Sequence, residues 1–370
     1  MARTVLITGG AGFIGSHLVD QLLDVGDEVR VLDNLVDQVH EGGKRPGDLA
    51  AEANLLVGDV RDPDTIRRAL GGVDAVVHLA ARVGVGQSMY EIADYVAANT
   101  AATAALLQAL LDNPVERLVV ASSMSIYGEG AYATENGAPA APVERTRAQL
   151  ERGAWEPRGA NGERLVAVPT SEATPPTLAS IYALTKYDQE RLCLLYGSAY
   201  DVPTVALRFF NVYGPRQALS NPYTGVLAIF ASRLLNDRPP LVFEDGRQRR
   251  DFVNVADAAR ACRLALERDE AAGYAVNVGS GKPVSILELA QELARLLGRE
   301  IEPELTGKFR VGDIRHCFAD VSLARERLGF EPTVGQNEGM AALADWLAEQ
   351  APTDRVDAAT EELVSRGLAR

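Results

Sequence analysis

Cysteine is scarce in this chain. Three cysteines, Cys193, Cys262 and Cys317, occur among 370 residues, far apart and without a CxxC pair. An odd number at such spacing argues against a disulfide framework or a zinc knuckle. The four histidines also lack the spacing of metal ligands. We therefore expect structural roles for the histidines and predict no metal site.

Long apolar runs and an excess of positive charge are absent as well. No stretch approaches the ~20 apolar residues that a membrane span requires, and the first residues do not resemble a secretory leader. The chain has 37 Lys and Arg against 51 Asp and Glu, a formal charge of −14. A general nucleic-acid-binding surface needs basic residues. We therefore predict a cytoplasmic protein that binds neither membranes nor nucleic acids.

The first third of the sequence alternates short apolar runs with amphipathic segments. Residues 13–25 have the 3.6-residue periodicity of a helix, and Gly26 is a stop signal. Strands separated by helices, with apolar residues on both faces, indicate an α/β fold with a doubly wound parallel sheet. The apolar runs that we predict as its strands are residues 4–8, 28–33, 54–57, 75–79 and 117–122.

The first of these runs leads into a glycine-rich turn. Gly9, Gly12 and Gly15 have the spacing GxxGxxG. Without side chains there, the strand can turn tightly, backbone N–H groups can approach a pyrophosphate, and the helix can pack on the strand. Asp33 ends the second run, 18 residues after Gly15. Its carboxylate can accept hydrogen bonds from a ribose and would repel a 2′-phosphate, so we predict a Rossmann domain that binds NAD rather than NADP.

Further cofactor contacts are expected where the third and fourth strands end. The Asp59 carboxylate can reach the adenine, with a helix-capping role as the alternative. The small residues after the fourth strand suit a cofactor lying on the sheet edge, and equally a tight core. The residues that we assign to NAD from this part of the chain are Gly9, Gly12, Phe13, Ile14, Gly15, Asp33, Asn34, Asp59, Val60, Leu79, Ala80 and Ala81.

Tyr182 and Lys186 are the centre of the predicted catalytic site. At positions i and i+4 they lie on one helix face, and Lys186 is one of only four lysines. A phenol with a pKa near 10 is only ~0.1% ionised at pH 7. A nearby ammonium and a nicotinamide cation can share the roughly 4 kcal/mol of phenolate stabilisation that neutrality requires. A surface Tyr/Lys pair is the alternative.

Polar residues at the ends of later strands point to a substrate. Ser123, after the fifth strand, can donate to a substrate oxygen as it becomes a carbonyl; Ser125 is its local competitor, and a loop-capping serine is the alternative. In the second half, Arg250 and Arg310 stand in basic clusters. Guanidinium groups suit diphosphate oxygens, although such clusters also occur on solvated surfaces.

Together these motifs resemble those of the extended short-chain dehydrogenases/reductases, specifically the nucleotide-sugar epimerases and dehydratases. The similarity extends over about residues 3–350 and rests on TGGAGFIGS, LDNL, GDVRD, HLAA, SSMSIYG, YALTK and LRFFNVYGP. It implies bound NAD, a nucleoside-diphosphate sugar as substrate, and a homodimer formed by the helices equivalent to Tyr95–Leu111 and Ala179–Tyr196.

The resemblance also implies roles for individual residues. Tyr182 would be the acid/base, Lys186 would contact the nicotinamide ribose, and Ser123 would hydrogen-bond the reacting sugar oxygen. Further cofactor contacts that it implies are Asn99, Ser122, Phe209 and Phe210, and the implied substrate contacts are Val85, Ser123, Ser125, Asn211, Val226, Arg250 and Arg310.

The chain departs from the dehydratases of this family, which have Asp-Glu where this chain has Met124 and Ser125. Without that pair, elimination of water has no obvious catalyst. We therefore predict 4-epimerisation: transient oxidation at C4, rotation of the 4-keto sugar, and return of the hydride. The pattern looks most like that of the 4-epimerases of dTDP-L-rhamnose. A 4-ketoreductase, a dehydratase using other acids, or a non-catalytic NAD-sensing scaffold are the alternatives.

The length suggests about two domains. We predict an NAD-binding Rossmann domain over residues 1–207, to which elements near 254–280 return. A smaller α/β nucleotide-sugar-binding domain follows over 208–350, with a helical appendage over 351–370. Residues 129–178 are rich in Pro and Gly and break the rhythm, so we expect an insertion that lies over the mouth of the active site as a lid, with a short hairpin around Asn161-Gly162.

Overall fold

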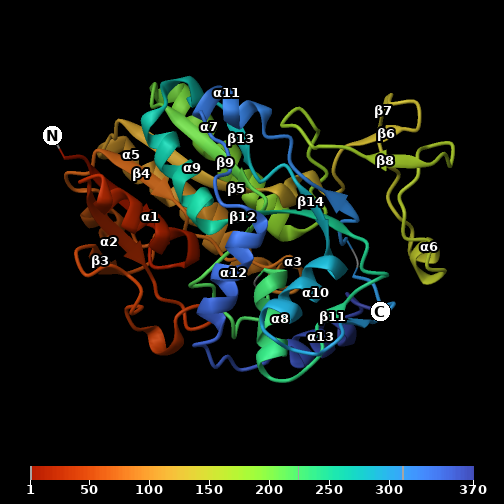
Figure 1. Ribbon diagram of the computed structural model, residues 1–370. Helices are drawn as coiled ribbons and strands as arrows, with labels where there is room; N and C mark the ends of the chain where they lie inside the picture. The colour runs from red at the N-terminus through yellow and green to blue at the C-terminus, as the bar shows by residue number, and fades with distance from the viewer. Residues whose placement is uncertain (1, 224, 311) are drawn as a thin grey trace.

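The computed structural model describes residues 2–223, 225–310 and 312–370. A seven-stranded parallel sheet lies at its centre, with the strand order β13-β9-β5-β4-β1-β2-β3 (Figure 1). This arrangement confirms the predicted doubly wound α/β fold. The strands are β1 (Thr4–Thr8), β2 (Glu28–Asp33), β3 (Asn54–Val57), β4 (Ala75–His78), β5 (Arg117–Ser123), β9 (Thr204–Phe209) and β13 (Ala275–Val278).

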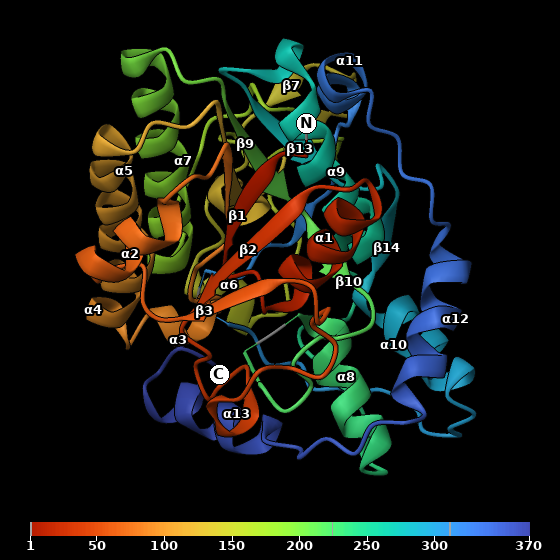
Figure 2. The same ribbon diagram turned by 90° about the vertical axis from the view of Figure 1, so that its left-hand side faces the viewer.

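Helices cover both faces of this sheet because its strands carry apolar residues on both faces. Val5 and Ile7 of β1 pack in the core cluster of one face, whereas Leu6 packs in that of the other. The first face is covered by α1 (Phe13–Asp24) and α9 (Val255–Glu267). The opposite face is covered by α2 (Pro63–Leu70), α5 (Ala102–Asp112) and α7 (Ile181–Tyr200), as Figure 2 shows.

The connection from β4 to α5 consists of short helices: α3 (Val85–Ser88), α4 (Ile92–Tyr95) and a single stretch of π-helix, η2 (Val96–Ala101). The 3₁₀ turn η3 (Met124–Tyr127) follows β5 directly. Two further 3₁₀ turns are η1 (Glu41–Gly43) and η4 (Asp269–Ala271). The β4–α5 connection and η3 matter for function, because both lie at the carboxyl end of the sheet, where ligands bind in open α/β folds.

The second half of the chain builds a smaller α/β unit with its own core. Its sheet contains β10 (Asn211–Tyr213), β12 (Arg249–Asn254), β14 (Pro283–Ser285) and β16 (His316–Cys317). β11 (Leu241–Val242) and β15 (Glu304–Leu305) form a separate parallel pair. Its helices are α8 (Val226–Leu235), α10 (Ile286–Leu296) and α12 (Gln336–Leu347), whereas α11 (Ser322–Leu328) packs with α9 on the main sheet. Thr224, near α8, and Val311, beside Arg310, lie outside the described residues.

The insertion at residues 129–178 has more secondary structure than its sequence indicates. It forms a small antiparallel sheet and one short helix that project from the body of the molecule (Figure 1). A tight turn does occur at Asn161-Gly162, where Gly162 has a φ of +78° and Arg158 pairs with Arg164 across it. Its elements are β6 (Tyr132–Thr134), β7 (Pro139–Ala140), α6 (Arg147–Glu151) and β8 (Leu165–Ala167).

Residues 351–370 contain a helix, α13 (Val356–Ser365), that is packed against the rest of the protein rather than standing apart. Val356, Ala359 and Leu363 occupy one side of it, at i, i+3 and i+7, and all three are buried. The expectation of an appendage was therefore wrong. The charged positions that suggested solvent exposure lie on the other side of a helix whose apolar side faces inward.

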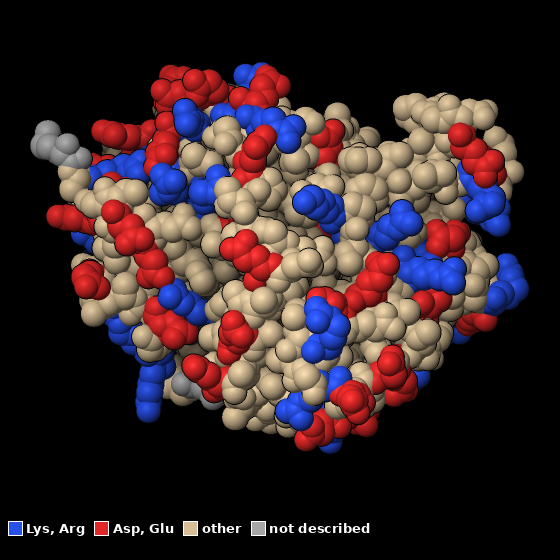
Figure 3. All heavy atoms as spheres, in the orientation of Figure 1, with Lys and Arg blue, Asp and Glu red and all other residues tan. Residues whose placement is uncertain are grey.

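Acidic and basic side chains are intermixed on the face of the molecule shown in Figure 3. The three cysteines are buried and unpaired with one another. Within the described ranges, no group of three or more His, Cys, Asp or Glu is arranged to hold a metal ion. Each helix in those ranges falls short of the length and apolar character needed to cross a membrane.

Candidate active site

A cleft of about 1170 Å³ lies at the carboxyl edge of the main sheet, between the two units. It is lined by the glycine-rich turn, the ends of β2, β4, β5 and β9, the first part of α7, and segments of the smaller unit. Every residue predicted for cofactor, catalysis or substrate lines this cleft except Asn99. Residues more than 200 positions apart in the sequence are thus brought to one site.

The glycine-rich turn has the backbone geometry that a dinucleotide needs. Gly9 has a φ of +71°, and a Cβ there would lie 2.7 Å from the backbone nitrogen of Ala80. A Cβ on Gly15 would lie 2.5 Å from the Cα of Gly10, so α1 can approach the turn only with glycine at this position. Gly12 caps α1. The free N–H groups and positive end of this helix therefore open into the cleft, as a pyrophosphate site requires.

Asp33 is held in place at the end of β2. One carboxylate oxygen accepts from the backbone N–H of Ala11 at 3.1 Å, and the other accepts from that of Leu35 at 3.0 Å. His40, which the sequence analysis did not single out, places Nε2 3.8 Å from the same carboxylate, and burial lowers the pKa of this imidazole. The Asp33 carboxylate and His40 therefore line the cleft side by side.

Asp59 does not cap a helix. Its carboxylate accepts from the guanidinium of Arg61 at 2.9 and 2.7 Å, and this hydrogen bonding lowers the pKa of Asp59. The cap of α2 is Asp62, which accepts from the N–H of Asp64. The capping alternative is therefore wrong for Asp59, which lines the cleft beside Val60.

Tyr182 lies in the first turn of α7, a helix that begins at a side-chain cap. The Ser180 hydroxyl accepts from the N–H of Ala183 at 3.1 Å, while the N–H of Tyr182 donates to Ser88 Oγ of α3 at 3.0 Å. Tyr182 and Ser123 both line the cleft, and their side chains interact. Burial raises the pKa of the Tyr182 phenol, and the interaction with Ser123 opposes that shift.

Ser123 and Ser125 belong to the same hydroxyl pair. Their Oγ atoms lie 2.6 Å apart, and Ser123 also accepts from the N–H of Ser125 as the cap of η3. The capping role and the contact with Tyr182 therefore coexist in Ser123. Ser123 is the one of the two whose interaction with Tyr182 affects the pKa of the phenol, which favours Ser123 as the substrate contact.

Lys186 is buried one turn beyond Tyr182. Its ammonium donates to Gln189 Oε1 at 2.7 Å, and burial lowers the pKa of Lys186 to about 7. Gln189 in turn contacts His78, whose ring nitrogens also lie near the hydroxyls of Thr8 and Thr103. Burial, with the charge of Lys186 adding to it, lowers the pKa of His78 to about 3. This histidine is a structural support beneath the lysine.

Two predicted cofactor contacts have their polar groups turned to the protein instead. The Asn99 amide is fully buried, accepts from the N–H of Arg82 at 2.7 Å, and donates to Arg82 O and to Thr185 Oγ1. Asn99 therefore holds the segment after β4 against α7 without lining the cleft. Ser122 lines the cleft, but its hydroxyl donates to Glu190 at 2.7 Å, so this hydroxyl points away from the cofactor side.

The substrate side of the cleft contains polar groups without protein partners. Asn211 Oδ1 and Arg310 Nε are buried and find no hydrogen-bond partner among the described residues. The Arg310 guanidinium lies 4.1 Å over the ring of Phe243, a residue that sequence reasoning missed. Unsatisfied buried polar atoms are rare, and these two line the cleft, where a bound ligand could supply the missing partners. Val226 begins α8 at the same wall, next to these groups.

Arg250 is more constrained than its sequence context suggests. Its guanidinium donates to the backbone carbonyls of Arg249 and Arg315 and to that of Ile314, and it lies 3.4 Å from Asp313. Part of its hydrogen-bonding capacity is therefore used to hold the 310–316 segment. Arg250 therefore acts in the cleft mainly through its positive charge, and less as a hydrogen-bond donor to a ligand.

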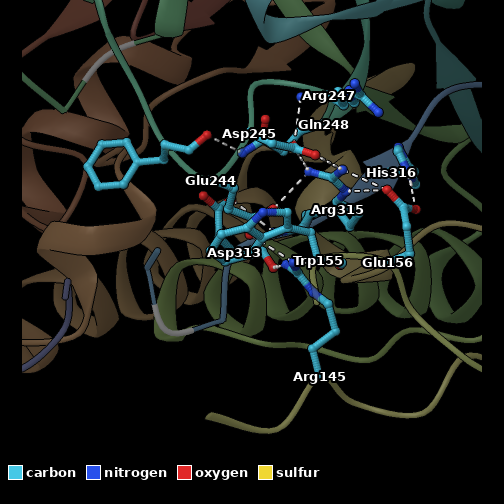
Figure 4. A network of polar contacts seen from close by, with 12 residues as sticks. Arg145, Trp155, Glu156, Glu244, Asp245, Arg247, Gln248, Asp313, Arg315 and His316 are labelled. Carbon is cyan, nitrogen blue, oxygen red and sulfur yellow. Dashed lines mark hydrogen bonds and ion pairs between the residues drawn. The ribbon is translucent and has the colours of Figure 1, made fainter. Parts of the chain in front are cut away.

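A buried ionic network fixes the insertion to this segment (Figure 4). Arg315, whose side chain is fully buried, pairs with Glu156 of the insertion at 2.6 Å and with Glu244 and Asp245 of the smaller unit at 2.9 and 2.6 Å. Arg145 of the insertion pairs with Glu244 at 2.7 Å and donates to the carbonyl of Asp313 at 2.8 Å. Arg315, Arg145 and Glu244 are buried and paired, so charge-assisted hydrogen bonds hold the insertion to this segment.

The lining of the cleft corrects the expected role of the insertion. None of its described residues, 129–178, lines the cleft, whereas α13 and the residues around it do. The lid expectation rested on the length of the insertion, which says nothing about where the segment folds. The residues of α13 and its flanks that line the cleft are Val356, Ala359, Thr360, Leu363 and Leu368.

Comparison with known proteins agrees with this geometry. Residues 5–150 and 157–279 match the model of the NAD dependent epimerase/dehydratase family. The chain is 36% identical over 354 residues to dTDP-L-rhamnose 4-epimerase of Burkholderia thailandensis, a match that covers 94% of this chain and 96% of the relative. It is 31% identical over 346 residues to a putative UDP-glucose 4-epimerase of Methanocaldococcus jannaschii, covering 93% and 98%.

Solved structures show the same relationship. UDP-glucose 4-epimerase of Thermotoga maritima with UDP-glucose superposes with a TM-score of 0.77 at 30% identity, covering 94% of this chain and 99% of that one. UDP-glucose 4-epimerase of Thermus thermophilus, in complex with NAD, gives 0.74 at 32% identity, covering 94% and 100%. The site is that of a nucleotide-sugar-modifying enzyme of the extended short-chain dehydrogenase/reductase type. The chain belongs to the NAD dependent epimerase/dehydratase family, and its cofactor is NAD.

Proposed function

We propose that this protein is an NAD-dependent nucleotide-sugar 4-epimerase whose substrate is a dTDP-6-deoxyhexose, with dTDP-L-rhamnose as the specific candidate. The observation that carries the proposal is that Tyr182, Ser123 and Lys186 line the same cleft as the dinucleotide turn. The similarity to the Burkholderia dTDP-L-rhamnose 4-epimerase supports the choice of sugar.

Three residues of this chain have separate roles in the reaction at C4 of the sugar. Ser123 holds the C4 oxygen, and Tyr182 takes the proton from this oxygen and later returns it. Lys186, whose pKa burial lowers to about 7, supplies positive charge beneath the phenol. Bound NAD supplies the hydride acceptor and, in the reverse direction, the hydride donor. A cleft of about 1170 Å³ leaves room for the 4-keto sugar to turn over between the two halves of the reaction.

The acidic residues of the cleft favour epimerisation over dehydration. A dehydratase needs a carboxyl group beside the reacting carbons to remove and donate protons. The described residues that line the cleft include no glutamate. They include five aspartates, of which Asp59 and Asp94 pair with arginines, Asp313 lies near Arg250, and Asp33 holds the glycine-rich turn. The fifth, Asp48, lies among the residues that follow β2.

An isotope experiment tests the proposed reaction. dTDP-L-rhamnose deuterated at C4 is incubated with the protein in ordinary water and followed by NMR. We expect the 4-epimer with deuterium retained at C4, because the hydride never leaves the site. A stable ketone that accumulates while NAD is consumed would indicate a ketoreductase working in reverse. A dehydrated product would indicate a dehydratase, and binding of NAD without conversion of any sugar nucleotide would indicate a scaffold.

We further propose that the protein forms a homodimer through α5 and α7. The two helices lie side by side on one flank (Figure 2), where the Tyr196 hydroxyl donates to the carbonyl of Leu110. Their outer side exposes Leu111, Leu195 and Tyr200, with exposed fractions of 41%, 58% and 57%. Light scattering is expected to give twice the chain mass for the native protein and a monomer for Leu195→Glu.

A further inference from the structure

The wall of the cleft that sequence reasoning missed belongs to α13. Val356, Ala359, Thr360 and Leu363 recur at i, i+3, i+4 and i+7, and all four line the cleft. Val364, the neighbour of Leu363, lies on the other side of the helix and is 44% exposed. One side of α13 is thus directed at the ligand space, and three of its four side chains there are apolar.

Leu363 reaches the part of the cleft nearest the catalytic tyrosine. A Cβ on Gly86 of α3 would lie 3.1 Å from Leu363 Cδ2, so the two segments are in close contact. α3 also contains Val85, which lines the cleft, and Ser88, which accepts the N–H of Tyr182. The contact between α13 and α3 therefore lies within one helical turn of the group that orients Tyr182.

The residues after α13 hold the other end of the cleft. The N–H of Phe309 donates to the carbonyl of Arg370 at 2.8 Å, and the N–H of Arg370 donates to the carbonyl of Phe309 at 3.0 Å. Arg310 and Ala369 form an antiparallel bridge, and Ala369 is 1% exposed. Residues 369–370 therefore fix the backbone of Arg310, whose Nε has no hydrogen-bond partner among the described residues.

Ionic and aromatic contacts anchor α13 at both ends. Arg233 of α8 is buried and lies 2.5 Å from Asp357, at the start of the helix, and 3.7 Å from Asp354. At the other end, the guanidinium of Arg366 lies 4.3 Å over the ring of Tyr90. A segment anchored in this way has a definite position relative to α3 and α8, which a wall of a binding site requires.

We propose that α13 and residues 368–370 complete the nucleotide-sugar site: Leu363 forms an apolar wall against the glycosyl group, and residues 369–370 position Arg310 for the diphosphate. This inference rests on the proposed function. Methyl and methylene groups at this wall suit the methyl group of a 6-deoxyhexose, since burying apolar surface on both partners is favourable. Within α3 and α13, the described residues that line the cleft include no cation that would pair with a sugar carboxylate.

Two substitutions test the two parts of this proposal separately: the positioning of Arg310 and the apolar wall at Leu363. Ala369→Asp places a charge at a buried position beside Arg310, and we expect about tenfold weaker binding of dTDP, measured by calorimetry on the NAD-loaded protein. Leu363→Ala removes the wall near the sugar. For it we expect about a tenfold higher KM for dTDP-L-rhamnose, a change of less than threefold in kcat, and unchanged dTDP affinity.

The controls exclude a general loss of structure. Val364→Ala changes the outer side of the same helix and is expected to match the native protein, and Leu363→Met is expected to restore the native KM. Bound NAD, measured by absorbance after denaturation, is expected to stay near native in all four variants, whereas Tm is expected to fall in Ala369→Asp and Leu363→Ala because both positions are buried. A merely structural role of Leu363 would lower kcat and NAD content as well as Tm and would overturn the inference.

The outcomes distinguish this inference from the function on which it rests. If the native protein binds dTDP and Ala369→Asp binds it equally well, the positioning of Arg310 by residues 369–370 is wrong. If Leu363→Ala keeps the native KM, the proposed role of Leu363 as a wall for the sugar is wrong, while the proposed 4-epimerase activity is unaffected. If the native protein binds neither dTDP nor UDP, both the proposed function and this inference fail.

Discussion

Arg208 on β9 and Glu190 on α7 form a bidentate ion pair, with distances of 2.6 and 2.9 Å. Their side chains are 8% and 1% exposed, and Ser122 donates to the same carboxylate. The strand that ends at Ser123 and the helix that contains Tyr182 are therefore joined by a buried charge network. This junction fixes the strand with Ser123 relative to the helix with Tyr182, the two residues proposed to act in catalysis.

Removing one partner of this pair is expected to be costly. Arg208→Met leaves the Glu190 carboxylate buried without its cation, and we expect the free energy of unfolding to fall by about 3–5 kcal/mol. Urea denaturation measures the loss. Arg147→Met, which removes an exposed i,i+4 pair with Glu151, is the matched control and should change stability by less than about 0.5 kcal/mol. Equal losses in the two variants would contradict the proposed importance of the buried pair.

Tyr182→Phe tests the acid–base role directly. A positioned proton-transfer group contributes roughly 10²–10⁴-fold to rate, so we expect kcat to fall by that factor while the fold and NAD binding remain. Tyr187→Phe, in the next turn of α7, is expected to keep nearly native activity. Initial rates by NMR with dTDP-L-rhamnose measure both. Turnover of Tyr182→Phe above one tenth of the native rate would remove this tyrosine from the mechanism.

The buried lysine predicts how stability depends on pH. The pKa of Lys186 is about 7 in the folded chain, against about 10.4 for an unperturbed lysine. Above pH 7 the unfolded chain therefore binds more protons than the folded one, and the free energy of unfolding rises with pH. Between pH 7 and 8.5 this amounts to ~2 kcal/mol at 1.36 kcal/mol per pH unit.

Lys186→Met is expected to remove this rise, and Lys282→Met, at an exposed position, is expected to keep it. The measurement is urea unfolding of the NAD-free protein at the two pH values. The window stops at pH 8.5 because burial raises the pKa of Cys193, Cys262 and Cys317 to about 12, which lowers stability once unfolded thiols ionise. A rise of equal size in Lys186→Met would show that other groups cause it.

Asp33 is predicted to determine the choice between NAD and NADP. Asp33→Asn keeps an acceptor for only one of the N–H groups of Ala11 and Leu35, and it removes the charge that favours ribose hydroxyls and repels a 2′-phosphate. We expect NAD affinity to fall about 10- to 100-fold, since hydrogen bonds to a charged group are worth about 1.5–3 kcal/mol. NADP affinity should rise. Asp24→Asn, at an exposed position, should alter neither when both are measured by fluorescence titration.

Local chemistry in the sequence predicted the NAD cofactor and placed Tyr182 and Lys186 on one face of a helix. A glycine turn between a strand and a helix, an aspartate at the next strand end, and a Tyr/Lys pair at i and i+4 are short-range patterns, and their physical requirements leave few alternatives. Gly15 illustrates this, because its helix can meet Gly10 only when there is no side chain.

Only the tertiary structure decided which distant segments share the cleft. Asn99 is a cofactor contact that the family resemblance implies, yet its amide is hydrogen-bonded to Arg82 and Thr185, and no local pattern reveals such long-range partners. The insertion was expected to cover the site, but burial of Arg315 among three carboxylates fixes it elsewhere. α13 closes the cleft in its place, because Leu363 meets Gly86 from a position 277 residues later in the chain. Such contacts depend on packing between surfaces that form only when the whole chain is folded.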